Sequence, residues 1–247
     1  MSAADLVLDA GNSRVKWGVV RGGDWVARGA LDTADSARLS SALPEVPQGF
    51  RRAVGCNVAG SEVASEIEAA LSRRGISILW NLATARQAGV VNAYDTPAQL
   101  GADRWAALIG AWARVGRACV VVNAGTAITI DSLDDSGVFR GGVILPGLMT
   151  MLQSLEARTA ALRHVPGRFS AFPANTADAM TTGVIDAAVG AVGRVRERLA
   201  RVCGGSLITV LAGGGAEDLA PHLGYAVLRV EALVLEGLRV VAREVGP

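Results

Sequence analysis

LVLDAGNSRVKWG, residues 6–18, is the stretch from which the fold can be worked out. An apolar run ends at Asp9, a short turn follows, and a second alternating run begins. Gly11 and Asn12 supply the backbone conformations that a tight turn between antiparallel strands needs. A plain β-hairpin is therefore the first interpretation, because turns of this composition are common.

The same turn also suits a phosphate. Backbone N–H groups at such a turn can cradle phosphate oxygens, and a carboxylate at the strand end can hold the accompanying Mg²⁺. Lys16 is the only lysine of the chain, whose other basic residues are arginines. A compact ammonium is suited to meeting a phosphate. Lys16 therefore favours phosphate binding over a plain hairpin.

A second stretch, VVVNAGTAITID at residues 120–131, can be aligned with the first. Asn123 falls on Asp9 and Gly125 on Gly11, at an offset of nearly half the 247 residues. An internal repeat of this length indicates a duplicated unit. We therefore predict two similar halves that place their glycine turns on opposite sides of one cleft.

Composition limits the class of protein. The chain is 51% hydrophobic and 19% charged, which supports a large core and argues against disorder. Its formal net charge of +1 gives no reason to expect nucleic acid or an anionic membrane as partner. No signal peptide or transmembrane span is visible, and the three cysteines are far apart, so we expect a cytoplasmic protein with free thiols.

Each half is predicted to begin with three strands that follow one another closely, at 5–10, 14–21 and 24–31 and again at 119–124, 126–132 and 138–145. Further strands are expected at 53–58, 76–80, 207–211 and 226–230. Helices are expected at 61–74 with Ser61 as N-cap, and at 96–115, 148–162, 176–202 and 231–245. This alternation predicts an α/β fold with mixed sheets, divided into domains 1–116 and 117–247.

The duplication and its turns resemble the actin, hexokinase and Hsp70 ATPase superfamily. That resemblance implies two duplicated ribonuclease-H-like domains with a nucleotide cleft between them. The glycine run at residues 211–215 is similar to the turn that lies on the adenosine side in that superfamily. Glycines there let the backbone approach a nucleotide closely, although a strand-to-helix turn also explains them.

The connecting stretch NAYDTPAQLGADRW, residues 92–105, carries the Gly-x-Asp-Arg signature of type III pantothenate kinases. GGVILPG at residues 141–147 resembles the glycine-proline turn of that family, and Asn175-Thr176 resembles its later substrate-contact pair. The resemblance runs over nearly the whole chain, with the motifs in the expected order. It implies ATP-dependent phosphorylation of pantothenate to 4′-phosphopantothenate, the first step toward coenzyme A.

The resemblance also implies roles for individual residues. Those expected to bind ATP are Asp9, Ala10, Gly11, Asn12, Ser13, Arg14, Val15, Lys16 and Thr126, with Asp9 near Mg²⁺. Those expected to bind pantothenate are Tyr94, Gly101, Ala102, Asp103, Arg104 and Thr176. Asp103 is expected to accept the proton of the substrate hydroxyl. A homodimer is implied as well, with pantothenate near the subunit interface.

The chemistry makes sense independently. Phosphoryl transfer to an alcohol needs in-line positioning, charge neutralisation and a carboxylate that orients the hydroxyl. The planar fork of Arg104 suits a carboxylate, which pantothenate possesses. Plainer readings remain: Asp103 and Arg104 as a solvated pair at a helix start, and Tyr94 as a cap on the edge of the core.

One position departs from the family pattern. The second loop of the family usually begins Asp-x-Gly-Thr, with an aspartate that helps to hold a monovalent cation, whereas this chain has Asn123. The amide offers an oxygen without the charge, so K⁺ or NH₄⁺ dependence is expected to be weak or absent. Two other functions stay open: a kinase of another small hydroxy acid, and a non-catalytic nucleotide-binding regulator on the same fold.

A group of arginines, Arg194, Arg196, Arg198 and Arg201, belongs to none of these motifs. We expect them to form a solvated helix face, with a role at an interface as the alternative.

Overall fold

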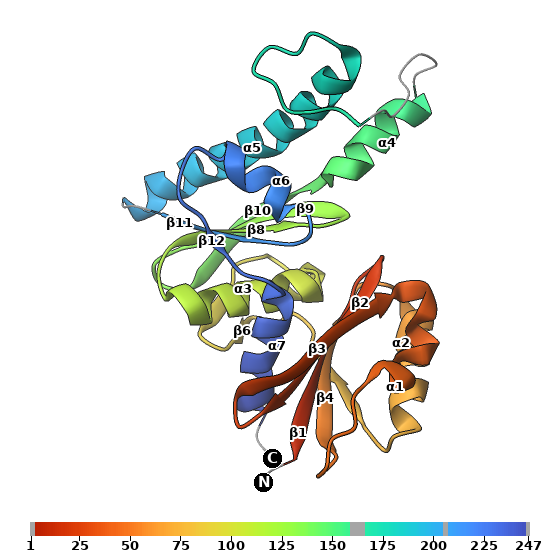
Figure 1. The fold of residues 1–247 in the computed structure, drawn as a ribbon. Helices are drawn as coiled ribbons and strands as arrows, with labels where there is room; N and C mark the ends of the chain where they lie inside the picture. Colours follow the sequence, from red (N-terminus) through yellow and green to blue (C-terminus); the bar gives the residue numbers. More distant parts are fainter. Residues whose placement is uncertain (1–2, 159–165, 205–206, 246–247) are drawn as a thin grey trace. The chain divides into compact units, whose positions relative to one another are not determined.

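The computed structural model describes residues 3–158, 166–204 and 207–245 (Figure 1). The chain folds into two compact units. The first contains the chain up to Gly116 together with the C-terminal segment from Ala232 onward, and the second is Arg117–Glu231. Of the described residues, none belongs to a helix with the length and apolar character needed to cross a membrane.

The first unit contains a five-stranded mixed sheet in the order β3-β2-β1-β4-β5. Its strands are β1 (Ala4–Ala10), β2 (Arg14–Arg21), β3 (Asp24–Asp32), β4 (Phe50–Asn57) and β5 (Ile78–Trp80). The hairpins β1–β2 and β2–β3 are antiparallel, whereas β4 runs parallel to β1 and β5 parallel to β4.

The second unit repeats this topology. Its strands are β8 (Cys119–Ala124), β9 (Ala127–Leu133), β10 (Val138–Pro146), β11 (Ile208–Ala212) and β12 (Leu228–Arg229). They lie in the order β10-β9-β8-β11-β12, again with two antiparallel pairs followed by two parallel pairs. The same order and directions in both units confirm the predicted duplication of a ribonuclease-H-like domain.

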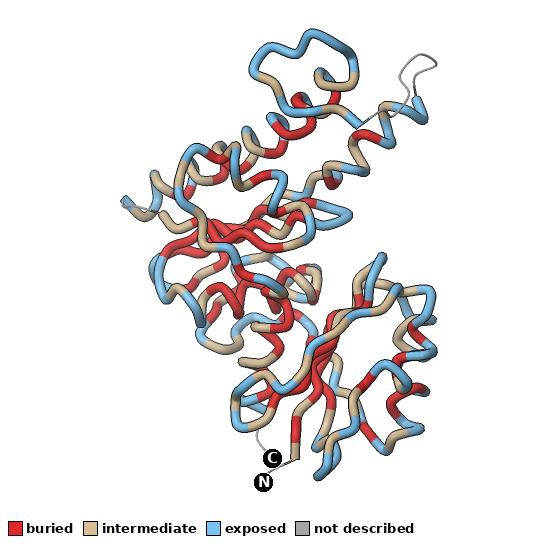
Figure 2. The backbone as a smooth tube through the Cα atoms, in the orientation of Figure 1, coloured by how far each residue is buried: buried red, intermediate tan, exposed pale blue. Residues whose placement is uncertain are grey.

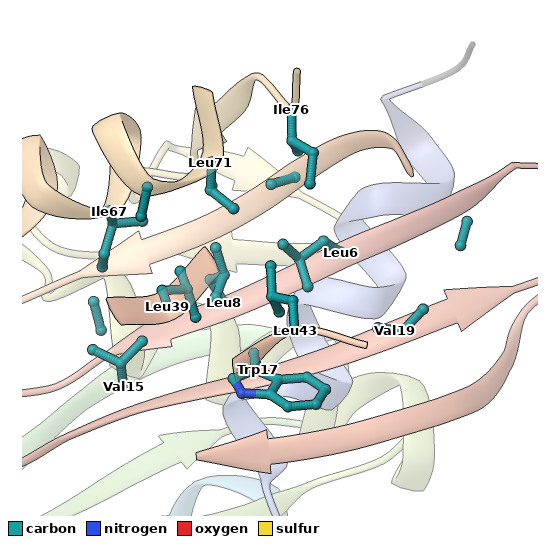
Figure 3. Packing of buried hydrophobic residues seen from close by; sticks show 14 residues of the cluster. Leu6, Leu8, Val15, Trp17, Val19, Leu39, Leu43, Ile67, Leu71 and Ile76 are labelled. Atoms are coloured by element: carbon teal, nitrogen blue, oxygen red, sulfur yellow. The ribbon is translucent and has the colours of Figure 1, made fainter. Parts of the chain in front are cut away.

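The two faces of the first sheet are covered by different helices. Successive side chains of a strand point to opposite faces, so Leu6 and Leu8 share one face and Val7 and Asp9 the other. Leu6 and Leu8 pack on a cluster that includes side chains of α1 (Leu39–Ala42) and α2 (Ser61–Ser72), as Figure 3 shows. Each buried leucine or isoleucine there contributes about 1.5–3 kcal/mol.

The opposite face, which carries Asp9, is covered by α3 (Ala102–Val115) and α7 (Leu233–Glu244) (Figure 1). These two helices cross at glycines. A Cβ on Gly237 would lie 1.8 Å from the carbonyl oxygen of Ala106, and one on Gly110 would lie 2.7 Å from that of Leu233. Only glycine permits so close an approach of two helix backbones.

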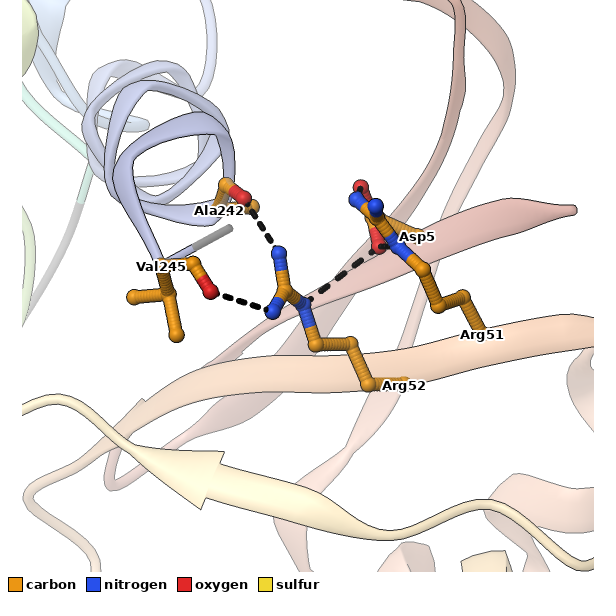
Figure 4. Close-up of polar contacts among 5 residues, drawn as sticks. All are labelled: Asp5, Arg51, Arg52, Ala242 and Val245. Carbon is orange, nitrogen blue, oxygen red and sulfur yellow. Dashed lines mark hydrogen bonds and ion pairs between the residues drawn. The ribbon is translucent and has the colours of Figure 1, made fainter. Parts of the chain in front are cut away.

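The closing helix differs from the expectation that it belongs to a domain 117–247. Its apolar stripe, which includes Leu238 and Val241, is fully buried within the first unit. Its C-terminus is tied there as well, because the Arg52 guanidinium donates to the carbonyl oxygens of Ala242 (2.6 Å) and Val245 (2.8 Å) (Figure 4). These carbonyls lie in the last turn of the helix and at its end, where a cation is favourable. Sequence periodicity reveals the apolar stripe but does not say which sheet it covers.

In the second unit one face of the sheet packs on α5 (Thr176–Cys203). Val122 and Ile130 of the sheet belong to one buried cluster with Val192 and Leu199 of the helix. A smaller cluster joins α5 to α4 (Leu148–Arg158) through Leu152, Met180 and Val184. Figure 2 shows the buried residues concentrated along the strands of both sheets.

Several local expectations need correction. The helix predicted over 96–115 is a 3₁₀ turn, η2 (Pro97–Gln99), followed by a break and α3. Gly60, not Ser61, is the N-cap of α2, and part of the loop expected after residue 80 forms the hairpin of β6 (Arg86–Gln87) and β7 (Val90–Asn92). The helix expected over 148–162 is described only as far as Arg158.

The remaining elements are short or irregular. They are η1 (Thr33–Arg38), α6 (Ala216–Leu219) and η3 (Ala220–His222). The three cysteines are free, as expected, and Cys56 and Cys119 are buried.

Candidate functional site

Asp9 lies near the end of β1, on the sheet face covered by α3 and α7. It pairs across the ladder with Lys16 of β2 on one side and with Cys56 of β4 on the other. Directly paired residues project from the same face of a sheet. The carboxylate, the ammonium and the thiol are therefore neighbours because of strand register alone.

Burial raises the pKa of Asp9 from 3.8 to about 6, because the charged carboxylate is removed from water. The Lys16 ammonium opposes this shift, whereas the negative charge of Asp103 adds to it. The Cys56 thiol donates a weak hydrogen bond to Asp9 Oδ1 at 3.7 Å. The fold thus brings together three residues expected from the sequence, Asp9, Lys16 and Asp103.

The first turn, residues 11–14, is held mainly by its own backbone and by Thr33. The Gly11 N–H donates to the Arg14 carbonyl at 3.1 Å, and the Thr33 hydroxyl donates to the Gly11 carbonyl at 2.7 Å. The Thr33 N–H donates to the Ser13 carbonyl at 3.1 Å. The Gly11 N–H is therefore used inside the turn, contrary to a simple phosphate cradle. Residues 12–14 are exposed, whereas Ala10 and Val15 are fully buried.

The Gly-x-Asp-Arg signature lies at the start of α3, with Gly101 as N-cap and Ala102 as the first helical residue. Asp103 Oδ1 accepts a hydrogen bond from the Arg104 N–H at 2.8 Å. The Arg104 side chain is buried, donates to the Tyr94 hydroxyl at 3.3 Å, and lies 6.0 Å from the centroid of that ring. Tyr94 and Arg104 thus form a contact pair beside Asp103.

Asn92 is a residue of this site that sequence reasoning missed. Its side chain is buried, accepts from the Tyr94 N–H at 3.1 Å and donates to the Pro97 carbonyl at 3.1 Å. The loop that carries Tyr94 is therefore closed by one amide. An asparagine two residues before the loop centre is an Asx-turn signal, so the sequence did contain a clue.

The second turn, Gly125 to Ala127, occupies the place in the second unit that the first turn has in the first. The Gly125 N–H donates to the Ala127 carbonyl at 2.9 Å. The Thr126 carbonyl accepts from the Gly147 N–H at 2.8 Å and from the Thr150 hydroxyl at 2.9 Å. A Cβ on Gly147 would lie 2.2 Å from the Gly125 carbonyl oxygen, which explains the glycine that ends the 141–147 motif.

The glycine run after β11 packs against the same turn. Gly213 has a φ of +95°, and a Cβ there would lie 2.3 Å from the Ala124 carbonyl oxygen. The Gly215 N–H donates to that oxygen at 3.0 Å. Asn123, half-buried, lies on the β8 strand just before it. Thus Asn123, Thr126 and the glycine run meet within the second unit.

Thr176 is the exposed first residue of α5. Its neighbour Asn175 is the N-cap of that helix, accepting from the Asp178 N–H at 2.9 Å and donating to the Asp178 carboxylate at 2.8 Å. Both polar atoms of the Asn175 side chain are therefore used in capping the helix. Of the pair, Thr176 is the residue whose side chain is left to contact a substrate.

The donor set near Asp9 limits which metal site the protein can offer. Among the described residues, no group of three or more His, Cys, Asp or Glu side chains converges as a metal site would. Mg²⁺ is commonly bound by one or two carboxylates and by substrate phosphates rather than by an all-protein cage. A buried carboxylate that, among the residues described, accepts a side-chain hydrogen bond from a thiol alone fits that kind of site, because a cation would relieve its desolvation.

The family model of type III pantothenate kinases matches residues 5–198. The chain belongs to this family. A type III pantothenate kinase from Aromatoleum aromaticum is 50% identical over 239 residues, covering 97% of this chain and 98% of the relative. One from Thiobacillus denitrificans is 42% identical over 246 residues, covering 100% and 99%. The resemblance inferred from the motifs is thereby confirmed.

Solved structures confirm the fold of this type III pantothenate kinase. A Campylobacter jejuni protein described as a Baf family transcriptional activator aligns with a TM-score of 0.64 at 20% identity, over 98% of this chain and 100% of that one. A ROK family glucokinase from Streptomyces griseus aligns with a TM-score of 0.55 at 10% identity, over 98% and 100%. At these identities the likeness concerns the duplicated α/β fold alone.

Proposed function

We propose that this kinase transfers the γ-phosphoryl group of ATP to the hydroxyl of pantothenate, giving 4′-phosphopantothenate for coenzyme A synthesis. The observation that carries the proposal is the convergence of Asp9, Lys16 and Asp103 in the first unit, in a chain of this family. Phosphoryl transfer requires these three kinds of group: a metal-holding carboxylate, a phosphate-binding cation and a proton acceptor.

Asp103 is the proposed proton acceptor and Arg104 the proposed partner of the pantothenate carboxylate. Arg104 is buried and its guanidinium already contacts the Tyr94 hydroxyl, so its plane is fixed before the substrate arrives. A preset guanidinium loses little entropy on pairing with a carboxylate. Gly101, Ala102 and Tyr94 would complete this side of the pantothenate site, with Thr176 contributing from the start of α5.

The phosphates of ATP are proposed to meet Lys16 and the exposed residues 12–14, with Thr126 contributing from the second turn. Asp9 would hold the Mg²⁺ of the nucleotide, which supplies charge neutralisation on the phosphates. Ala10 and Val15 would act through the backbone, because they have no exposed side-chain surface. Gly11 would shape the turn, because its N–H and carbonyl are bonded within it and to Thr33. A homodimer and a weak monovalent-cation site at Asn123 belong to the same proposal.

The test is product identification by mass spectrometry after incubation with ATP, Mg²⁺ and pantothenate. We expect an added phosphoryl group on pantothenate and stoichiometric ADP, and both products formed about 10²-fold more slowly by the Asp103→Asn protein. A panel of other small hydroxy acids offered at equal concentration tests the neighbouring kinase activity. ATP binding without phosphorylation of any acceptor would overturn the proposal in favour of a nucleotide-binding regulator.

A further inference from the structure

A cavity of about 380 Å³ lies in the second unit and contains none of the residues assigned above. One wall is the middle of β10, from Arg140 to Val143, and the other is the C-terminal part of α5. Ser132 of β9 also lines it. Cavities of this volume are at the lower end of the range in which proteins bind small molecules.

The cavity exists because β10 lacks a side chain at Gly141, on the side that faces α5. The ladder with β9 shifts register between Phe139 and Gly141, and Gly141 has a φ of +115°. A Cβ on Gly141 would meet no atom within 4 Å, so space is open beside it. The bulge and Gly141 thus leave room that a side chain on a regular strand would fill.

Ser132 brings a hydroxyl to the wall of the cavity. The residue is 8% exposed and lies on β9, where it pairs with Gly141 of β10. Because it lines the cavity, a ligand there can form a hydrogen bond with it.

Two guanidinium groups line the same cavity. Arg140 donates from Nε to Asp134 at 2.6 Å, so one edge of its fork is used. Arg198 is exposed and has no ion pair or hydrogen bond within the described part of the chain. The other arginines of α5 differ: Arg194 pairs with Glu197, and Arg196 lies 4.0 Å from the centroid of the Tyr225 ring. Arg198 therefore brings an uncompensated positive charge to the cavity.

The rest of the lining is apolar, formed by the side chains of Val143, Val195, Leu199 and Val202. We propose that this cavity binds a small organic carboxylate. The guanidiniums of Arg140 and Arg198 and the Ser132 hydroxyl would hold the carboxylate, and the aliphatic part would lie on the valine and leucine side chains. Charge-assisted hydrogen bonds to guanidinium favour a planar carboxylate, and the apolar wall favours a carbon chain over an inorganic anion.

The full-length protein without nucleotide is titrated with sodium hexanoate, using calorimetry and ligand-observed NMR. Hexanamide serves as the neutral analogue and inorganic phosphate as the anion without a chain. We expect saturable hexanoate binding with a Kd of about 1 mM or below, and binding of hexanamide and of phosphate at least tenfold weaker, at about 10 mM or above.

Three variants locate the site. Arg198→Gln and Ser132→Ala should weaken hexanoate binding, the first by about tenfold or more. Arg201→Gln removes the same charge from an exposed position on the same helix that does not line the cavity, and should leave the Kd within about twofold. Thermal melting of each variant checks that it is folded.

Three results would overturn the inference. The first is the absence of saturable hexanoate binding by the wild type. The second is an equal loss of affinity in Arg198→Gln and Arg201→Gln, which would mean general attraction to a basic surface. The third is phosphate binding as tight as that of hexanoate, which would contradict the organic-acid class. Phosphorylation of pantothenate should proceed at the wild-type rate in Arg198→Gln, so failure of this inference and failure of the proposed function are distinguishable.

Discussion

The two units place chemically different residues at the same point of one topology. Where the first strand of each sheet ends, the first unit has Asp9 paired with Lys16 and Cys56. The second has Asn123 paired with Thr129 and Ala212. The first copy thus has a carboxylate between an ammonium and a thiol, and the second has an amide between a hydroxyl and a methyl group. The backbone is thus repeated, whereas the charge is found in one copy alone.

The turns that follow differ in how they are supported. The first turn is one residue longer than the second, and a threonine hydroxyl from outside the hairpin braces it. The second is braced by backbone and hydroxyl donors and by two glycines, Gly147 and Gly213, whose missing side chains allow close approach. The first copy is thus specialised by charge and the second by shape, as expected if one holds metal and phosphate and the other orients the nucleotide.

The largest expected effect tests whether the charged copy carries the chemistry. Asp103→Asn should lower turnover by about 10²-fold or more while nucleotide binding stays, because a positioned acid–base group is lost without a change of shape. Steady-state kinetics and calorimetry with ATP measure the two quantities. Asp95→Asn, an exposed carboxylate of the preceding loop, is the matched control. Equal kcat in Asp103→Asn and the wild type would remove Asp103 from the mechanism.

The second prediction tests the copy specialised by shape. Gly213→Ala should lower the free energy of unfolding by about 3 kcal/mol, since it adds a strained φ and a clash with a backbone carbonyl. Gly214→Ala is the control, because a Cβ there would meet nothing within 4 Å and its φ is ordinary. Urea unfolding measures both variants. If the two alanine variants are equally stable, the glycine run is not needed for close packing.

How far the sequence could predict these features depends on the distance between the residues involved. The turn at residues 11–14 and the strands around it follow from local pattern, and so did the repeat that aligned Asn123 with Asp9. The pairing of Cys56 with Asp9 depends on the register of a parallel strand 47 residues away, which no local pattern encodes. The docking of α7 on the first unit likewise depends on which sheet offers a complementary face. The charged residues Asp9 and Lys16 were therefore predictable from the sequence, but the thiol and the helix that lie beside them were not.

The third prediction concerns Asp9→Asn, which gives the first unit the residue type that the second has at the aligned position, Asn123. The pKa of Asp9 is 3.8 unperturbed and about 6 when folded. Below about pH 4 the carboxyl is protonated in both states and costs nothing, whereas above pH 6 the folded state must hold a buried charge. In EDTA, the metal-free wild type should therefore lose about 2–3 kcal/mol of stability relative to Asp9→Asn as pH rises from about 4 to 7. Urea unfolding across this range measures the difference. Parallel pH profiles for the two proteins would show that Asp9 is not desolvated.

The smallest expected effect comes from the reverse conversion, Asn123→Asp. Cation sites are tuned by the charge of their ligands, and Asn123 offers a neutral oxygen where a carboxylate is the family pattern. The natural protein should therefore show little activation by K⁺ or NH₄⁺, and Asn123→Asp should show cation activation of about a few-fold. Activity is titrated with K⁺ at constant ionic strength, with Na⁺ as balance.

Asp95→Asn measured in the same titration tells a local effect from a general one, since it changes the charge of an exposed carboxylate in the other unit. Strong K⁺ dependence of the natural protein would show that a neutral oxygen at position 123 suffices. Activation that arises only in Asn123→Asp would mean that the neutral amide at position 123 is the reason why the natural protein does not respond to a monovalent cation. Because Asn and Asp have nearly the same shape, such a result would assign the difference to charge and leave the repeated backbone without a part in it.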